Sequence, residues 1–229
     1  MGAREDILGG IRRGLGRGEL AGEARAAAEA RLRDHPRNLI PQRSLIPAQQ
    51  RIDLFVRLTE ALASTVTRVT AAADVPDAVA SYLAQHNLPS KIRMAPDPWL
   101  GDLPWTDRPL LQIAKGRTDQ NDMVTVTRAF AGIAETGTLM LTSGPDTPTT
   151  LNFTPDNCIV VLKTSDMVGP IEEGWSKLRA AFGANWPRTV NFVGGPSRTA
   201  DIEQELIMGA HGPRRLHIVL VDDRAPESA

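Results

Sequence analysis

Apolar and polar residues follow two different spacings along most of the chain. In 51–64, RIDLFVRLTEALAS, large apolar residues recur every three or four positions, which indicates an amphipathic helix. In 158–163, CIVVLK, the residues are mostly consecutive apolar and β-favouring types, which is typical of a buried strand. Comparable patterns predict helices over 74–88, 166–181 and 201–209, strands over 65–70, 91–96, 110–115, 189–195 and 216–223, and further β-structure in 124–143.

The alternation of strands and helices predicts an α/β fold with a mixed, mostly parallel sheet flanked by helices. Within it, GIAETGTLMLTSGP (132–145) predicts a hairpin whose two-residue turn is Thr136-Gly137, with Gly137 at positive φ. A hairpin contributes an antiparallel pair, so we expect a mixed sheet.

The first 48 residues differ from the rest. Apolar residues in 7–15 fall on one helical face, but five glycines between Gly9 and Gly18 weaken that helix. Residues 22–36, GEARAAAEARLRDHP, form a strong helix pattern with Leu32 as the only large apolar residue. We therefore expect a helical N-terminal arm (1–48) and an α/β domain (49–229). The arm is either a loosely packed tail or a contact for a partner or a second copy.

Composition excludes several classes of protein. The 229 residues are 41% apolar and 23% charged, as in ordinary globular proteins, and the net charge of -1 favours neither nucleic acid nor an anionic membrane. No apolar run approaches the roughly 20 residues of a membrane span. The N-terminus carries acids and lacks the apolar core of a signal peptide. We expect a cytoplasmic protein.

Cysteine usage limits the redox chemistry. Cys158 is the only cysteine, and an iron–sulfur cluster needs about four thiolates. The four histidines are scattered without metal-binding spacing. We expect no cofactor or metal on this chain, so that any redox centre belongs to another protein, and we expect Cys158 to be a buried apolar residue.

Two loops carry candidate anion-binding groups. Gly194-Gly195-Pro196-Ser197 follows a predicted strand, and ligands of parallel α/β sheets gather at the carboxyl ends of strands. Arg198 adds a planar charge suited to carboxylate or phosphate. In the second loop, GAHGPRR, His211 can titrate near neutrality. Alternatively, the glycines only make turns, Asp201 and Gln204 form a helix cap, and the arginines are solvated.

Glu135 has two interpretations. It is a polar residue at the end of a hairpin strand, or a base, nucleophile or clamp for a ligand. Several acids are open as its partner: Asp146, Asp156, Asp166 and Asp201.

Together, GIAETGTLMLTSGP, CIVVLKTSDMV and GGPSRTADIEQELIMGAHGPRRLHIVLVDD resemble the LutC/YkgG family of lactate-utilization (LUD-domain) proteins over about residues 50–223. The resemblance implies a fold similar to the phosphosugar isomerase, ribose-5-phosphate isomerase and CoA-transferase group. It also implies that this protein acts with two cysteine-rich partners that carry iron–sulfur clusters, in oxidising L-lactate to pyruvate. Association of identical copies is left open.

The motif positions give the candidate site. Glu135 and His211 are the catalytic candidates, as acceptors of the lactate hydroxyl proton. The ligand-binding candidates are Thr136, Gly137, Thr138, Gly195, Ser197, Arg198, Asp201, Glu203 and Gly212. The ligand would be a small anion, either lactate or a phosphate-bearing cofactor. Two other functions remain open: a non-catalytic assembly or regulatory subunit, and an independent isomerase or acyl-transfer enzyme.

Overall fold

A computed structural model describes residues 2–37, 39–119, 121–200, 206–209 and 211–224. The chain divides into two compact units, Met1–Leu39 and Ile40–Ala229. The described part contains no helix that is both long and apolar enough to cross a membrane.

The first unit consists of α1 (Ala3–Gly14) and α2 (Gly22–Asp34). The first turn of α1 carries Glu5, whose carboxylate accepts a hydrogen bond from the Gly2 amide at 2.6 Å, and the last turn carries Arg12 and Arg13. These charges complement the helix dipole, so α1 forms despite its glycines. Neither helix contains a buried residue among those described.

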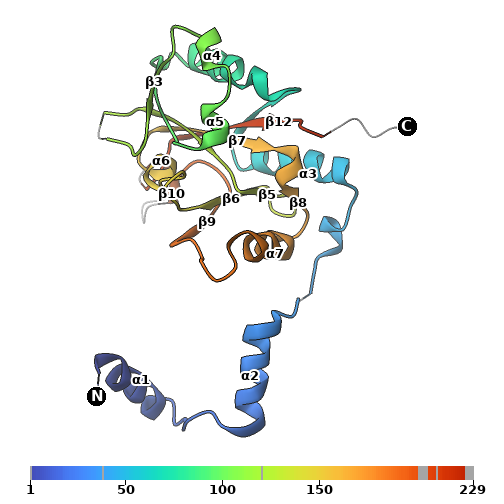
Figure 1. Cartoon of the computed structure of the whole chain (residues 1–229), viewed down its shortest axis with the longest axis vertical. Helices are drawn as coiled ribbons and strands as arrows, with labels where there is room; N and C mark the ends of the chain where they lie inside the picture. The colour runs from blue at the N-terminus through green and yellow to red at the C-terminus, as the bar shows by residue number, and fades with distance from the viewer. Residues whose placement is uncertain (1, 38, 120, 201–205, 210, 225–229) are drawn as a thin grey trace. The chain divides into compact units, whose positions relative to one another are not determined.

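The second unit is built on a six-stranded parallel sheet (Figure 1). In spatial order its strands are β1 (Thr65–Val69), β12 (Arg215–Val221), β7 (Asn157–Lys163), β4 (Val124–Arg128), β2 (Lys91–Met94) and β3 (Gln112–Lys115). Every neighbouring pair runs parallel. The α/β class with parallel strands is therefore confirmed.

A separate four-stranded sheet contains the hairpin. Its order is β8 (Met167–Val168), β5 (Ala131–Ile133), β6 (Thr138–Thr142) and β9 (Val190–Val193). It packs on the parallel sheet rather than extending it. Gly132 permits this close approach, because a Cβ there would lie 2.7 Å from Cδ2 of Leu162 on β7.

Helices complete the layers. They are α3 (Ala48–Ala61), α4 (Val75–Gln85), α5 (Pro98–Gly101), α6 (Thr150–Phe153) and α7 (Ile171–Phe182), with 3₁₀ turns at Gln42–Ser44, Ala72–Asp74, Trp105–Asp107 and Thr164–Asp166. The α4 helix covers one face of the parallel sheet, and α3 and the second sheet cover the other. The α7 helix packs on the outer face of the second sheet (Figure 1).

Two predicted helices differ from the structure. Residues 206–208 form a strand, β11 (Leu206–Met208), which pairs antiparallel with β10 (Arg198–Ala200), so the helix predicted over 201–209 is wrong there. Pairing with a distant strand overrides local helix propensity. The remainder of that prediction, including the cap at Asp201 and Gln204, lies outside the described residues. The helix predicted from residue 166 begins at Ile171, because residues before a proline, here Pro170, disfavour helical φ and ψ.

His217 is buried on the α4 face of β12 and is 3% exposed. Its ring stacks on Tyr82 at a centroid distance of 4.0 Å, and its Nδ1 lies 2.8 Å from Oγ1 of Thr65. Its Nε2 has no partner among the described residues. Burial, and secondarily the charge of His86, lowers its pKa from 6.5 to about 4.

This pKa shift predicts a pH-dependent stability. The folded state binds the His217 proton less tightly than the unfolded state, so its contribution is complete above pH 6.5 and is lost as the pH falls toward 4. The loss should reach about 2 kcal/mol between pH 7.5 and pH 5, measured by urea unfolding. His217→Gln should remove this component, whereas the exposed-residue control His35→Gln should retain it. An unchanged profile in His217→Gln would contradict the assignment.

Candidate functional site

Glu135 lies in a four-residue turn, 134–137, between β5 and β6. Ile133 pairs with Thr138, so the predicted two-residue turn is wrong, although Gly137 has the expected positive φ of 65°. The longer turn directs Glu135 inward, where it is 8% exposed.

The Glu135 carboxylate faces the start of α7. Its Oε2 accepts a hydrogen bond from the Ile171 amide at 3.4 Å, and its Oε1 lies 3.6 Å from Nη2 of the exposed Arg43. The Glu135 amide donates to the Gly169 carbonyl at 3.1 Å. A carboxylate at a helix N-terminus is favoured by the helix dipole. These contacts tie the turn to α7.

Three other predicted residues converge on the C-terminal end of α3. A Cβ on Gly137 would lie 2.7 Å from the Thr59 amide nitrogen, and a Cβ on Gly195 would collide with the Leu62 carbonyl oxygen. Arg198 donates from Nη2 to that carbonyl at 2.6 Å. A cation at a helix C-terminus is stabilising. Gly137, Gly195 and Arg198 therefore have defined packing roles.

Ser197 joins the two predicted anion-binding loops. Its amide donates to the Pro213 carbonyl at 2.8 Å, its carbonyl accepts from Gly209 at 3.0 Å, and its Oγ accepts from the His211 amide at 3.2 Å. The His211 side chain is exposed, and a Cβ on Gly212 would contact Ser197 at 3.3 Å. The structure thus brings Ser197, His211 and Gly212 together.

Of the remaining candidates, Thr136 and Thr138 hydrogen-bond to each other through their hydroxyls at 2.6 Å. Asp201 and Glu203 lie outside the described residues. The ligand site expected after residues 189–195 requires that they form a strand of the parallel sheet. They do not, because β9 pairs antiparallel with β6 in the second sheet.

The carboxyl edge of the parallel sheet holds a charged cluster that the sequence analysis missed. We call Asp97, Trp99, Arg128 and Lys163 the edge cluster. Asp97 and Trp99 follow β2, Arg128 ends β4 and Lys163 ends β7. The strand order reverses between β2 and β4, and such a switch point is the usual ligand position in parallel α/β sheets.

Trp99 is the centre of the edge cluster. Nζ of Lys163 lies 4.7 Å, and the guanidinium carbon of Arg128 5.7 Å, from its ring centroid. Asp97 accepts a hydrogen bond from the Leu100 amide at 3.0 Å and pairs with Nε of Arg128 at 3.2 Å. Arg128 is therefore fixed by Asp97, while Lys163 contacts the ring face through a weaker cation–π interaction.

Among the described residues, the carboxylate nearest to Lys163 is that of Asp223, whose Oδ2 lies 3.8 Å from Nζ. Burial raises the pKa of Asp223, but hydrogen bonds from Ser165 and Thr164 outweigh it, so the pKa is lowered overall and the group stays charged. The Ser165 hydroxyl donates to Asp223 at 2.6 Å. Because Asp223 is bound mainly by these neighbours, Lys163 keeps capacity for an anionic ligand. Charged or aromatic residues directly after predicted strands were the sequence signal for this cluster.

Cys158 is buried as expected, with 2% exposure. Burial raises the pKa of its thiol to about 12. It is therefore protonated at neutral pH and unsuited to act as a nucleophile or metal ligand.

Gly137→Ala should lower the free energy of unfolding of the domain by about 2 kcal/mol or more. Two effects add up: an alanine is strained at the positive φ of this position, and its Cβ would collide with the backbone of α3. Gly183→Ala is the control for positive φ without close packing: Gly183 has a φ of 53° and a ψ of -118°, with open space around its Cβ position. It should lose less than Gly137→Ala, because it adds backbone strain without a collision. Urea unfolding measures both, and equal losses would show that close packing on α3 is unimportant.

Comparison with known proteins gives the family. The LUD domain family model matches residues 52–221. Lactate utilization protein C of Halalkalibacterium halodurans is 34% identical over 110 residues, which are 47% of this chain and 47% of that protein. The Bacillus subtilis protein of the same name is 33% identical over 103 residues, which are 44% of this chain and 43% of that protein. Each match thus spans about half of the relative's length.

A solved structure shows the same fold. The crystal structure of a DUF162 family protein from Deinococcus radiodurans aligns with a TM-score of 0.57 and 20% identity, covering 77% of this chain and 99% of that one. At this identity the likeness concerns the fold alone. Because the LUD domain model matches most of the sequence, this chain belongs to the LUD domain family.

Proposed function

We propose that this chain is a cytoplasmic subunit of an L-lactate oxidation system. The observation that carries the proposal is the LUD domain match over 52–221, together with relatives named for lactate utilization. Oxidation of lactate to pyruvate removes two electrons and two protons, so the system needs an electron acceptor. The buried, protonated Cys158 is a poor cluster ligand. We therefore assign the iron–sulfur clusters to cysteine-rich partner proteins, to which the electrons would pass.

The edge cluster is the place we propose for a small anionic ligand. Lys163 and Arg128 come from neighbouring strands and bring two positive charges to the switch point. Asp97 pairs with Arg128 at 3.2 Å, whereas Asp223 approaches Lys163 only to 3.8 Å, which is beyond hydrogen-bond distance and leaves the ammonium donors for a ligand. The carboxylate of a lactate-sized ligand would form a charged hydrogen bond with Lys163. The rest of the ligand would pack against Trp99.

The ligand position can be tested by calorimetry of the full chain with L-lactate and pyruvate. Lys163→Ala should weaken binding at least tenfold, which corresponds to about 1.4 kcal/mol, because it removes the ligand's main counter-charge. Lys91→Ala is the control, since this exposed lysine begins β2 at the opposite end of the strand. Arg198→Ala and Glu135→Gln test the site predicted from the sequence.

The outcomes separate the two sites. If Arg198→Ala and Glu135→Gln weaken binding while Lys163→Ala does not, the ligand lies at the Glu135 turn and the Ser197 loop. If the wild-type chain binds neither compound, the ligand-binding part of the proposal fails. Growth on L-lactate after deletion and restoration of the gene tests the lactate role separately, and unimpaired growth of the deletion strain would overturn it.

A second candidate is a non-catalytic assembly subunit, and the first unit favours it. Large apolar side chains of α1 and α2 are exposed, including Ile7 at 64%, Ile11 at 52% and Leu32 at 77%. Exposed apolar residues on one helix face suit a protein contact.

For this candidate, removal of residues 2–39 should abolish co-purification with the cluster-carrying partners, because the apolar contact is lost. Ile7→Ser combined with Ile11→Ser should reproduce the loss without shortening the chain, and Glu23→Gln, on the exposed surface of α2, should not. Retention of the partners by the shortened chain would exclude the first unit as the contact.

A further inference from the structure

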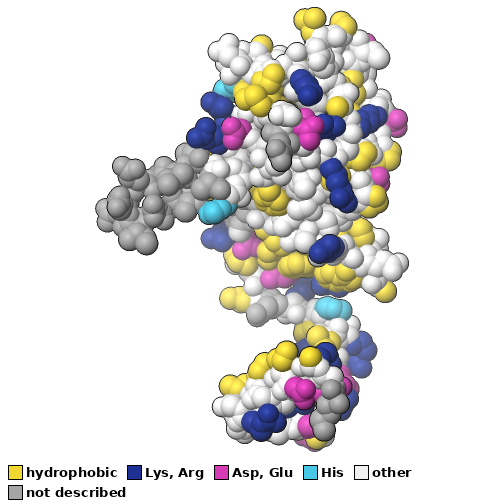
Figure 2. Space-filling model, turned by 90° about the vertical axis from the view of Figure 1, so that its left-hand side faces the viewer, with side chains coloured by type: hydrophobic (Ala, Val, Ile, Leu, Met, Phe, Trp, Pro, Cys, Tyr) yellow, Lys and Arg dark blue, Asp and Glu magenta, His cyan; other side chains and the backbone are white. Residues whose placement is uncertain are grey.

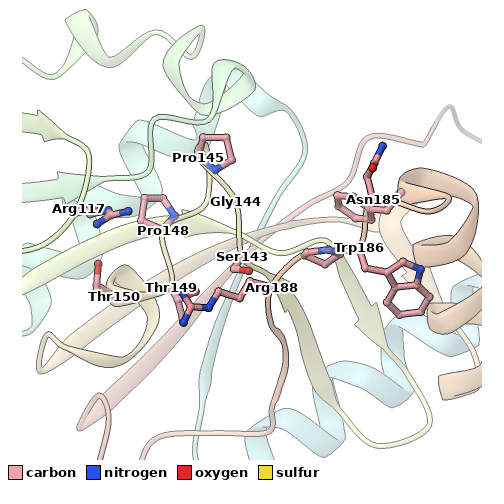
Figure 3. A pocket seen from close by; sticks show the side chains of 12 residues that line it. Arg117, Ser143, Gly144, Pro145, Pro148, Thr149, Thr150, Asn185, Trp186 and Arg188 are labelled. Atoms are coloured by element: carbon pink, nitrogen blue, oxygen red, sulfur yellow. The ribbon is translucent and has the colours of Figure 1, made fainter. Parts of the chain in front are cut away.

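A pocket of about 700 Å³ (Figure 3) has no lining residue in common with the edge cluster or with the residues around Glu135 and Ser197. It is lined by Arg117, which follows β3, by the segment from Ser143 to Thr150 between β6 and α6, and by residues 182–188 at and beyond the end of α7. Its volume falls within the range of roughly 300–1,000 Å³ that is typical of small-molecule sites.

Cations and hydroxyls gather on one side of this pocket. Arg117 and Arg188 are exposed, and neither pairs with a carboxylate in the part of the chain that the structure describes. Figure 3 shows both near Thr149 and Thr150, with Ser143 between them and the far wall. Unpaired arginines beside hydroxyl groups are suited to a phosphate, which guanidinium groups bind through two parallel hydrogen bonds.

The hydroxyls keep donor capacity for such a ligand. The Ser143 hydroxyl oxygen accepts a hydrogen bond from the Thr189 amide at 2.8 Å, so its proton remains available. The Thr149 and Thr189 hydroxyls lie 3.5 Å apart, a long contact that a stronger acceptor would readily replace.

An aromatic wall lies on the other side. Trp186 is 46% exposed, and its ring lies against Trp175 at a centroid distance of 6.3 Å and an interplanar angle of 29°. Figure 3 places Trp186 and Asn185 across the pocket from Arg117. An exposed indole supported from behind provides a surface on which a planar base can stack, and the Asn185 amide can hydrogen-bond to a base edge.

From this arrangement we propose that the pocket binds a nucleoside diphosphate. Arg117 and Arg188 hold the phosphates, with donors from Ser143 and Thr149, and the base stacks on Trp186. The site is separate from the edge cluster, and the proposal does not depend on the lactate role.

Calorimetry of the full chain with ADP tests this site, with adenosine and pyrophosphate as probes of each half. ADP should bind saturably and at least tenfold more tightly than either fragment. The double variant Arg117→Ala/Arg188→Ala should weaken ADP binding at least tenfold and leave adenosine binding unchanged. Trp186→Ala should weaken ADP and adenosine alike and leave pyrophosphate unchanged.

Arg57→Ala is the matched control, because Arg57 is an exposed arginine on α3 that does not line this pocket. It should bind ADP as the wild type does. Absence of saturable ADP binding would overturn the proposal, and so would equal weakening by Arg57→Ala and the double arginine variant. Because the substituted arginines are exposed, the unfolding curves of the arginine variants should coincide with that of the wild type. Trp186→Ala removes the contact with Trp175, so its folded fraction is measured first and ADP binding is compared between folded proteins.

Discussion

Burial of β7 on both faces is the constraint on which the domain depends. Ile159 and Val161 face α4, whereas Cys158, Val160 and Leu162 face α3 and the second sheet. A strand with apolar residues on both sides must be covered on both sides, since each exposed side chain would forfeit the free energy gained by its removal from water. The layered order of α4, parallel sheet, second sheet and α7 follows from this requirement (Figure 1).

Covering the second face with a sheet requires close contact, and glycines provide it. Because Gly132 has no Cβ, the Leu162 side chain can pack directly against its backbone. In the same way, Gly174 on α7 leaves room for the Ile133 side chain on the other face of the second sheet. Gly137 and Gly195 then let two turns meet the end of α3. Packing therefore explains these four glycines of the chain. The cations proposed to bind ligands lie elsewhere, at the carboxyl edge of the parallel sheet and around the pocket beside Trp186. Figure 2 shows that positive and negative side chains are mixed on one face of the molecule.

The candidate site was only partly predictable from the sequence. The link between Ser197 and His211 joins two loops that the motif analysis had placed together. Arg198 and Glu135 were recognised as unusual, yet Arg198 binds the end of α3, and Glu135 binds the start of α7 and Arg43. The edge cluster was missed because the rule for carboxyl ends of parallel strands was applied to β9, which belongs to the other sheet. Strand membership depends on pairing between distant segments, and local sequence carries little information about it.

The sequence by itself determined the alternation of helices and strands, the burial of Cys158 and the family resemblance, because periodicity, composition and motifs are local properties of the chain. Tertiary structure decided which strands share a sheet, that 206–208 pair with 198–200 instead of forming a helix, and that Arg128, Lys163 and Trp99 meet at one edge. These outcomes depend on hydrogen bonds and packing between residues far apart in the sequence. Such contacts are worth more than the few tenths of a kcal/mol per residue by which local propensities differ.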